Sequence, residues 1–320
     1  MRALSGTQPS GALHIGNYLG ALKQYIALQD EMEGFYFLAD YHALTTIRDP
    51  EAMRENTLSA ALDFLACGLD PERSVLFKQS DVPEVTELTW LLSCVTPMGL
   101  LERCHAYKEK VAEGLPAEHG LFAYPVLMAA DIIIYDSDIV PVGQDQKQHV
   151  EVTRDIAIRF NTTFGDTLKL PEARIVDVVA TVPGIDGRKM SKSYGNAIEI
   201  ASDDETTRRR VMSIVTDSTP VEAPKDPDAC NVMALYRLFA SPEDVRAMEE
   251  RYRAGGYGYA EAKRQLASTI NDYFRPIRER RRKLQNDMPY VLDVLAEGAR
   301  KARAEARQTL DRARAAAGYV

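Results

Sequence analysis

The segment ALSGTQPSGALHIGNYLG, residues 3–20, decides the fold class that we expect for this chain. Residues 3–5 read as the end of a strand, and the glycines and proline that follow predict a tight loop. Apolar residues then return at helical spacing from Leu19 to Leu28, so a helix follows the loop. A strand, a short turn and a helix in this order form the first half of a βαβ unit.

Strands and helices continue to alternate along the chain. Residues 34–40 and 74–77 are apolar runs of strand length, and residues 50–67 between them have helical spacing. Residues 138–143 predict a further strand and turn. Apolar strands of this kind are typical of parallel sheets that are covered on both faces. We therefore expect an α/β fold, a Rossmann-like doubly wound parallel sheet whose ligands lie beyond the carboxyl ends of the strands.

The second part of the chain is predicted to be helical. Helical patterns run from about residue 201 almost to the end, interrupted by a loop rich in proline and aspartate at residues 220–227. The expected organisation is a Rossmann-like domain at residues 1–197 and a C-terminal α-helical domain at residues 198–320. The first domain contains a helical insertion at about residues 81–130.

The composition is that of an ordinary globular chain. Of the 320 residues, 45% are hydrophobic and 27% are charged. No apolar run is long enough to span a membrane, and Gly6 comes too early for the apolar core of a signal peptide. No C-x-x-C pair indicates a zinc or redox site. The four cysteines are scattered, as is typical of a reducing cytoplasm, where we expect the protein; they are Cys67, Cys94, Cys104 and Cys230.

The charge is distributed unevenly along the chain. The net charge is -8, yet residues 251–320 hold 16 Lys and Arg against 8 Asp and Glu. A basic C-terminal segment on an acidic body is expected if that end contacts phosphate groups. A solvated helical face with surplus arginine explains the same counts, so charge alone leaves both explanations open.

The loop at residues 8–20 is a candidate phosphate site. Gly11, Gly16 and Gly20 leave the backbone open to a flat ligand, and the free N–H groups at the start of the helix favour a negatively charged one. His14 can donate hydrogen bonds to phosphate oxygens. A glycine-rich turn with a capping histidine is the alternative explanation, because short motifs often match by chance.

The segment Lys189-Met190-Ser191-Lys192-Ser193 is the second candidate. It follows a turn-rich stretch at residues 183–187, which predicts an exposed loop. Two lysines three positions apart can meet the negative charge of pyrophosphate as it leaves ATP, which lowers the barrier of such a reaction. A solvated Lys/Ser loop explains most K-x-x-K pairs, but the full string is rare by chance.

Together the two segments resemble the signature motifs of class I aminoacyl-tRNA synthetases, which carry an H-I-G-H string before the first helix and K-M-S-K-S after the last strand. Asn17 replaces the final histidine of the first string, which departs from the class pattern but is similar to the H-I-G-N-Y form of tryptophanyl-tRNA synthetases. Residues 8–21 and 124–155 resemble that family throughout, and the similarity extends along nearly the whole chain.

The choice of amino acid depends on residues 124–131. If these residues are helical, Tyr124, Met128 and Asp131 lie on one face. The middle position resembles glutamine in the tyrosine enzymes, whereas a flexible apolar methionine suits the indole ring of tryptophan. Asp131 can accept the indole N–H, and a phenyl ring would leave that carboxylate unpaired. Core filling by Met128 and a surface charge at Asp131 form the alternative.

The resemblance implies further site residues. His42 and Gln146 join Tyr124, Met128 and Asp131 in the expected tryptophan site. The expected catalytic residues are His14, Asn17, Lys110, Lys189 and Lys192. The expected ATP contacts are Gln8, Pro9, Ser10, Gly16, Asn17, Gly143, Gln144, Asp145, Val182, Lys189, Met190, Ser191, Lys192 and Ser193. Position 144 is glutamate in many relatives and glutamine here, so the chain departs from the family pattern at this expected ribose contact.

The implied reaction has two steps, activation of L-tryptophan by ATP and transfer to the 3′ end of tRNA(Trp). The tryptophan carboxylate is ionised at neutral pH, so the first step needs positioning and charge stabilisation but no general base. Mg²⁺ accompanies ATP with little protein ligation, and no protein metal site is expected. The resemblance also implies a homodimer with an interface in residues 81–130. The C-terminal helices would contact the tRNA anticodon, with candidate phosphate contacts in residues 275–283 and 300–314.

Three alternatives stay open at this point. A tyrosine–tRNA ligase shares both motifs and differs in the amino acid that it activates. A cofactor-synthesising nucleotidyltransferase shares an H-x-G-H-like loop but does not usually carry K-M-S-K-S or a basic helical tail. A synthetase paralogue without catalysis would bind a partner only, and the intact His14, Asp131, Lys189 and Lys192 argue against it.

Overall fold

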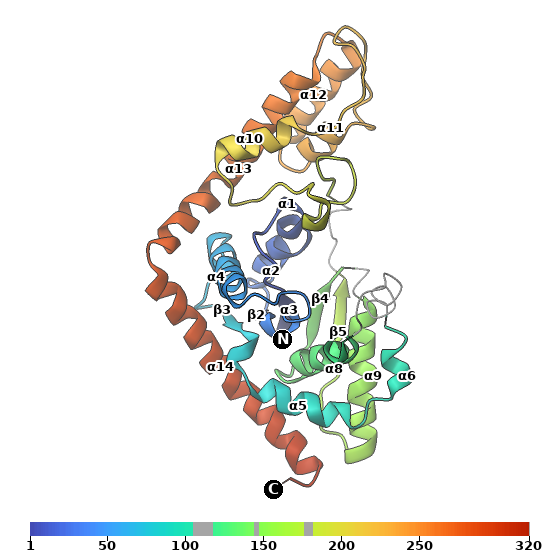
Figure 1. The fold of residues 1–320 in the computed structure, drawn as a ribbon, viewed down its shortest axis with the longest axis vertical. Coiled ribbons are helices and arrows are strands. Elements are labelled where there is room, and N and C mark those ends of the chain that lie inside the picture. The colour runs from blue at the N-terminus through green and yellow to red at the C-terminus, as the bar shows by residue number, and fades with distance from the viewer. Residues whose placement is uncertain (105–117, 144–146, 176–181, 320) are drawn as a thin grey trace.

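A computed structural model describes residues 1–104, 118–143, 147–175 and 182–319 of the chain. Five strands form one sheet in the order β3-β2-β1-β4-β5, and every neighbouring pair is parallel (Figure 1). The strands are β1 (Arg2–Thr7), β2 (Glu33–Leu38), β3 (Ser74–Lys78), β4 (Ile139–Val142) and β5 (Glu172–Ile175). The predicted α/β fold with a parallel sheet is confirmed.

The helices fall into those of the sheet region and those of the C-terminal region. In the sheet region they are α1 (Ile15–Asn17), α2 (Lys23–Leu28), α3 (Asp40–Ala43), α4 (Pro50–Ala66), α5 (Glu84–Ser93), α6 (Met98–Leu101), α8 (His119–Ile133) and α9 (Lys147–Phe164). A π-helical turn at Tyr18–Leu22 joins α1 to α2. The C-terminal helices are α10 (Asp204–Met212), α11 (Asn231–Tyr236), α12 (Pro242–Ala254), α13 (Tyr259–Gln285) and α14 (Met288–Ala316).

Strand β2 shows why the sheet is covered on both faces. Its side chains point alternately to the two faces, and both sets are buried. Tyr36 and Leu38 join the hydrophobic cluster that contains the first helices, α4 and the C-terminal helices. Phe35 and Phe37 join the cluster that contains α5, α8 and α9. A strand that is buried on both faces has a continuous run of apolar residues, and residues 34–40 show this pattern in the sequence.

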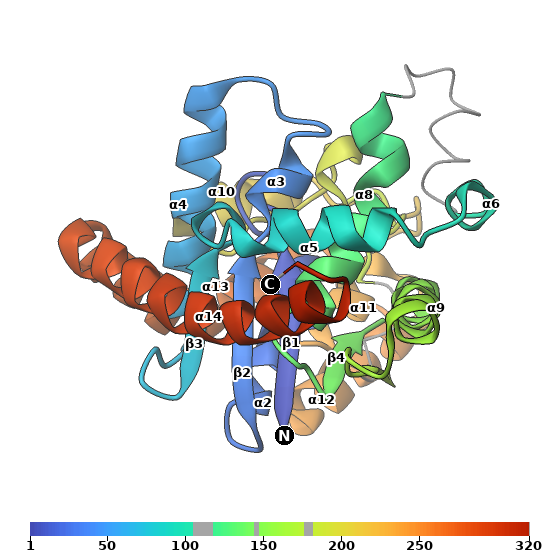
Figure 2. The same ribbon diagram turned by 90° about the horizontal axis from the view of Figure 1, so that it is seen from below.

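Helix α14 runs back from the C-terminal region and packs along the sheet. Figure 2 shows it crossing the strands beside α5, and it contacts both β3 and α5. Gly298 allows this close approach, because a Cβ atom there would lie 1.9 Å from the carbonyl oxygen of Leu76. Since β3 is the edge strand, α14 covers an edge that would otherwise present unpaired backbone groups.

The arginines of the C-terminal segment bind mostly to the protein itself. On α13, Arg281 donates to Asp63 of α4 at 2.6 Å, and Arg278 donates to the carbonyl oxygen of Ile200 at 3.0 Å. On α14, Arg303 and Arg307 both reach the buried Glu84 of α5, at 2.9 and 3.2 Å. Arg312 and Arg314 are likewise paired with Asp136 and Glu87. Part of the basic surplus therefore stabilises the packing of these two helices.

One strand of the fold differs from what the sequence indicates. Strand β5 was not predicted, because its four residues at the sheet edge carry no apolar run. The region from residue 198 onward is helical as expected, with α10, α11 and α12 gathered at one end of the molecule (Figure 1). The division at residues 197 and 198 stays a prediction, since α14 packs on the sheet. Among the described residues, no helix is both long and apolar enough to cross a membrane.

Candidate active site

The glycine-rich loop, residues 8–17, follows β1 and ends in a reciprocal cap. His14 is the N-cap of α1, and its Nδ1 atom accepts the backbone N–H of Asn17 at 3.3 Å. The Asn17 side-chain oxygen in turn accepts the backbone N–H of His14 at 3.2 Å. Because Nδ1 and the amide oxygen both act as acceptors, the hydrogens of both side chains lie on the atoms not used in the cap. The cap therefore leaves the His14 Nε2–H and the Asn17 amide N–H₂ as available donors.

The protonation state of His14 agrees with this cap. Burial, with a smaller contribution from the positive charge of Lys192, lowers the pKa of His14 to about 4. The ring is therefore neutral at pH 7 and keeps one N–H, on Nε2. A neutral donor polarises a phosphate oxygen without gaining or losing a proton during the reaction.

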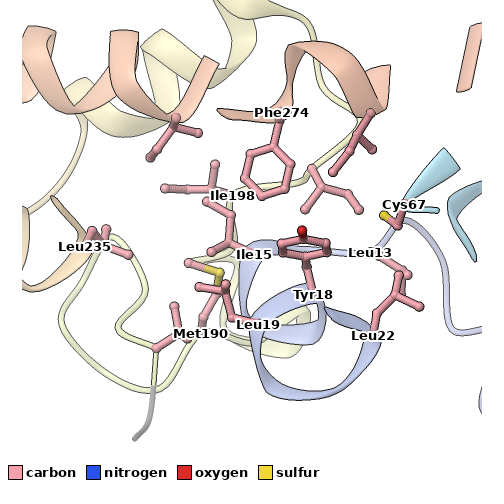
Figure 3. Packing of buried hydrophobic residues seen from close by; sticks show 14 of the residues in the cluster. Leu13, Ile15, Tyr18, Leu19, Leu22, Cys67, Met190, Ile198, Leu235 and Phe274 are labelled. Atoms are coloured by element: carbon pink, nitrogen blue, oxygen red, sulfur yellow. The ribbon is translucent and has the colours of Figure 1, made fainter. Parts of the chain in front are cut away.

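The lysine loop, residues 182–194, begins as a hairpin. Met190 donates its backbone N–H to the carbonyl oxygen of Val182 at 2.9 Å, and Gly184 donates to Arg188 at 2.7 Å. Gly187 supplies the positive φ of 84° that the turn requires. The Met190 side chain is buried in the hydrophobic cluster together with Ile15 of the first helix, as Figure 3 shows. This methionine therefore anchors the loop by packing.

The lysine loop and the glycine-rich loop lie against each other. Lys192 donates from Nζ to the carbonyl oxygen of Ser10 at 3.0 Å. The two segments are also joined through the backbone that follows the lysine loop, since Ile15 donates to Ile198 at 2.9 Å and Ile200 donates to Leu13 at 3.0 Å. The two sequence motifs, more than 170 residues apart, therefore meet at one site.

Asn196 fixes the lysine loop from within. Its side chain is 1% exposed, and its oxygen accepts the backbone N–H of Ser191 at 2.8 Å. Its amide nitrogen donates to Asp186 at 2.7 Å and to the carbonyl oxygen of Lys189 at 3.1 Å. One buried amide thus ties the second arm of the loop to its turn. No motif in the sequence indicated this residue, because its role depends on contacts within the folded loop.

A cavity of about 930 Å³ opens between the two loops and the carboxyl ends of the strands. One part, here called the loop side, is lined by the two loops. The other part, the acceptor side, is lined by residues of α8 and by His42. Among the predicted site residues, those that line the cavity are Gln8, His14, Gly16, Asn17, His42, Tyr124, Met128, Gly143, Val182, Lys189, Met190 and Ser191.

Other predicted site residues lie beside the cavity or outside the described part of the chain. Ser10 and Lys192 contact each other next to its wall, and Pro9, Ser193 and Asp131 are also not among the lining residues. The predicted contacts Lys110, Gln144, Asp145 and Gln146 fall outside the described residues.

The acceptor side leads to a buried cluster of Asp131, His42 and Gln79, which we call the acceptor cluster. Asp131 lies on α8 as predicted and is 1% exposed. His42 Nε2 lies 2.8 Å from Asp131 Oδ2. The Gln79 amide nitrogen donates to both carboxylate oxygens, each at 2.8 Å. His42 lines the cavity and so connects the buried carboxylate to it.

Gln79 is not among the site residues that the sequence predicts. It directly follows β3, within a short 3₁₀ turn at Gln79–Asp81, and its side chain is 1% exposed. A polar residue just beyond a predicted strand of a parallel sheet is where ligand contacts are expected. That position was a usable signal, because residues 74–77 had been predicted as a strand.

Comparisons with known proteins agree with this geometry. A family model described as tRNA synthetases class I (W and Y) matches residues 1–275. The chain is 58% identical over 314 residues to a tryptophan–tRNA ligase of Rhodopirellula baltica, covering 98% of each. It is 54% identical over 320 residues to that of Fusobacterium nucleatum, covering 100% of this chain and 98% of the relative. The Campylobacter jejuni tryptophanyl-tRNA synthetase complexed with ADP and tryptophan has a TM-score of 0.94 at 49% identity, covering 99% of this chain and all of that one.

Proposed function

The chain belongs to the class I tRNA synthetases for tryptophan and tyrosine, and we propose that the cavity between its two loops is where it activates L-tryptophan with ATP. The enzyme is a tryptophan–tRNA ligase, which forms tryptophanyl-adenylate and pyrophosphate and then transfers tryptophan to the 3′ end of tRNA(Trp). The meeting of the lysine loop and the glycine-rich loop at one cavity is the observation that carries the assignment of the site.

The loop side binds ATP in this proposal. The donors left by the cap, His14 Nε2–H and the Asn17 amide, would contact phosphate oxygens from the wall of the cavity. Lys189 and Lys192 stand on the opposite loop, where their charges would meet the developing negative charge on the departing pyrophosphate. The tryptophan carboxylate attacks the α-phosphate, the bond to the β-phosphate breaks, and no proton is transferred in this step.

The acceptor side binds tryptophan. Met128 and Tyr124 would flank the indole ring from α8. Asp131 offers carboxylate lone pairs that can accept the indole N–H, and His42 links them to the cavity. The resemblance to the family adds Gln146 near the ammonium group of tryptophan. The same resemblance adds Lys110, Gln144 and Asp145 near the nucleotide.

ATP is expected to arrive as its Mg²⁺ complex. Within the described residues, no group of three His, Cys, Asp or Glu side chains could hold a metal ion. A magnesium ion held by phosphate oxygens and water fits such a site, because Mg²⁺ keeps most of its water and takes few protein ligands. We propose that the metal enters and leaves with the nucleotide.

The remaining assignments concern partners. We propose that residues 198–320 form the tRNA-binding domain and that the chain acts as a homodimer in the cytoplasm. Exposed basic residues of α13, such as Arg282 and Lys283, support a tRNA contact. By contrast, the paired arginines of α14 are poor candidates, because contact with phosphate would break their present ion pairs. The four free cysteines fit a reducing compartment.

The test is ATP–pyrophosphate exchange measured separately with each of the twenty amino acids. Exchange with tryptophan, and at least about 10³-fold less with tyrosine and phenylalanine, is expected if the carboxylate accepts the indole N–H. Exchange that depends mainly on tyrosine would contradict the assignment of the acceptor side. Absence of exchange with every amino acid would contradict activation at this cavity.

A further inference from the structure

We propose that Gln79 is a positioning residue for tryptophan recognition, which orients the Asp131 carboxylate as a hydrogen-bond acceptor for the indole N–H. This inference rests on the proposed function of the acceptor side. It adds a residue that does not itself line the cavity, since Gln79 is buried and is not among the lining residues. The argument depends on which end of the Gln79 amide faces the carboxylate.

The backbone settles the orientation of this amide. The Gln79 side-chain oxygen accepts the backbone N–H of Tyr41 at 3.1 Å. A backbone N–H can only donate, so the oxygen must face Tyr41 and the N–H₂ group must face Asp131. A flipped amide would set one donor against another at Tyr41 and one acceptor against another at Asp131. The position of Tyr41, at the start of α3, therefore determines what Gln79 presents to the carboxylate.

The carboxylate then has only acceptors to offer. The amide nitrogen of Gln79 lies 2.8 Å from both oxygens of Asp131, so neither oxygen can usefully carry a proton toward it. Burial raises the pKa of Asp131, whereas the hydrogen bonds from His42 and Gln79 lower it. Without the donor at position 79, one of the interactions that lower the pKa of Asp131 would be lost, and burial would raise this pKa further. A protonated Asp131 would lose an acceptor that the indole N–H requires.

The other ionisable groups near the carboxylate do not supply this donor. His42 on α3 lines the cavity, so an arriving indole competes with it for Asp131 Oδ2. Asp40, also on α3, raises the pKa of Asp131 and is bound by Ser80. Tyr135, which follows α8, is fully buried, and this burial and then the charge of Asp131 raise its own pKa. Gln79 is the neutral donor that keeps the carboxylate oriented while tryptophan enters and leaves.

The substitution Gln79→Glu tests this role with almost no change of shape. The new side chain can still accept the Tyr41 N–H, but it faces Asp131 with a second carboxylate. At low pH, two adjacent carboxylates share one proton. Above the pH at which the pair loses that proton, the two negative charges repel each other. A shared proton restores a donor at position 79, so the defect should disappear as the pH falls.

The measurement is the ratio of the tryptophan KM of Q79E to that of the wild type, from about pH 5.5 to 8.5, in ATP–pyrophosphate exchange. Taking the ratio at each pH removes effects that both proteins share, including titration of His42. We expect a ratio of roughly 10 to 100 at the alkaline end, from the loss of one hydrogen bond to a charged group, and a fall toward 1 at the acid end. The KM for ATP should stay within about twofold of the wild-type value.

A matched control is Gln29→Glu. The Gln29 amide oxygen accepts a backbone N–H, that of Asp70, as the Gln79 amide oxygen does, but its amide nitrogen donates to the carbonyl oxygen of Gly68 and faces no carboxylate of the site. Q29E should leave the tryptophan KM unchanged at every pH. A Q79E ratio near 1 throughout, or one equally raised at every pH, would overturn the proposal.

A second variant guards against misfolding of Q79E. Gln79→Met keeps the volume and removes the donor, so it should weaken L-tryptophan binding by about tenfold in titration calorimetry, with no pH-dependent recovery. Wild-type affinity in Q79M would overturn the role of Gln79. Failure of the proposed function looks different, because the unmodified chain would then show no tryptophan-dependent exchange.

Discussion

The two sides of the cavity present charge in different ways. On the loop side, the cations stand on a loop near solvent, and Tyr194 at its end is 54% exposed. On the acceptor side, the charged group is the carboxylate of Asp131, which is 1% exposed and held by the side chains of His42 and Gln79. A site that must release pyrophosphate benefits from charge that stays accessible to solvent. A site that must distinguish one aromatic ring from another benefits from a buried acceptor, because a mismatch there leaves a polar group unpaired.

Replacement of Lys192 should separate the two sides most clearly. Lys192→Ala removes a charge that is proposed to meet the reacting phosphates, so the rate of ATP–pyrophosphate exchange should fall by about 10²- to 10³-fold. Binding of tryptophan, measured by titration calorimetry, should change by less than about twofold because the acceptor cluster is intact. Lys169→Ala, at a lysine paired with Asp138, serves as the control. A parallel loss of exchange and tryptophan binding would indicate misfolding instead and would erase the contrast.

Replacement of Asp131 should have the opposite pattern. Asp131→Asn keeps the shape but turns one acceptor oxygen into a donor group that faces the Gln79 amide. The KM for tryptophan should rise by roughly 10- to 100-fold, as expected for a lost hydrogen bond to a charged group, while the KM for ATP stays nearly constant. Asp138→Asn, at the far end of β4, is the matched control. Equal changes in both constants would mean that the two sides are not independent.

Asn196 tests whether the loop side depends on the internal order of the lysine loop. Asn196→Ala removes the three hydrogen bonds that tie the loop together, so the KM for ATP should rise by about tenfold through misplacement of the lysines. Asn161→Ala removes a similar set of bonds from the loop between α9 and β5, away from the cavity. If both variants behave alike, the effect belongs to stability and not to the site.

Replacement of His14 should have the smallest effect, which is a change in how the free energy of unfolding depends on pH. The unfolded chain protonates His14 at about pH 6.5, whereas the folded chain does so only at about pH 4. The unfolded state therefore binds more protons between these values, so the folded state loses stability as the pH falls from about 6.5 to 4. His14→Asn retains an N-cap acceptor and should show a weaker decline in urea unfolding between pH 7 and pH 5. An identical decline in both proteins would contradict a neutral His14.

The parts of the fold that sequence predicts are those set by local patterns. Strand β2 is buried on both faces and is therefore an uninterrupted apolar run, and the spacing of Tyr124, Met128 and Asp131 agrees with helix α8. Strand β5 is short, lies at the edge and carries Glu172 and Arg174, so local pattern gives no indication of it. The path of α14 is equally hidden, because it depends on the distant contact between Gly298 and Leu76.

The site divides in the same way. The residues proposed to act on the phosphates form two continuous strings, so the sequence indicates both of them, including His14 and Lys192. Gln79 and Asn196 act through hydrogen bonds that join separate segments of the chain or one arm of a loop to its turn. Such contacts leave no periodic or motif-like trace. The basic run around Arg281 also needed the structure, because its charge alone did not reveal the bond to Asp63.

The contact of α14 with β3 has a consequence for how the protein is made. A ribosome delivers residues 74–78 long before residues 288–316, so the outer strand must wait for more than 200 residues with one side uncovered. Domains generally begin to fold during synthesis, and uncovered strands invite pairing with other chains. Helix α14 therefore covers this strand only late in synthesis. Chains shortened at residue 287 should accumulate as aggregates when produced in cells.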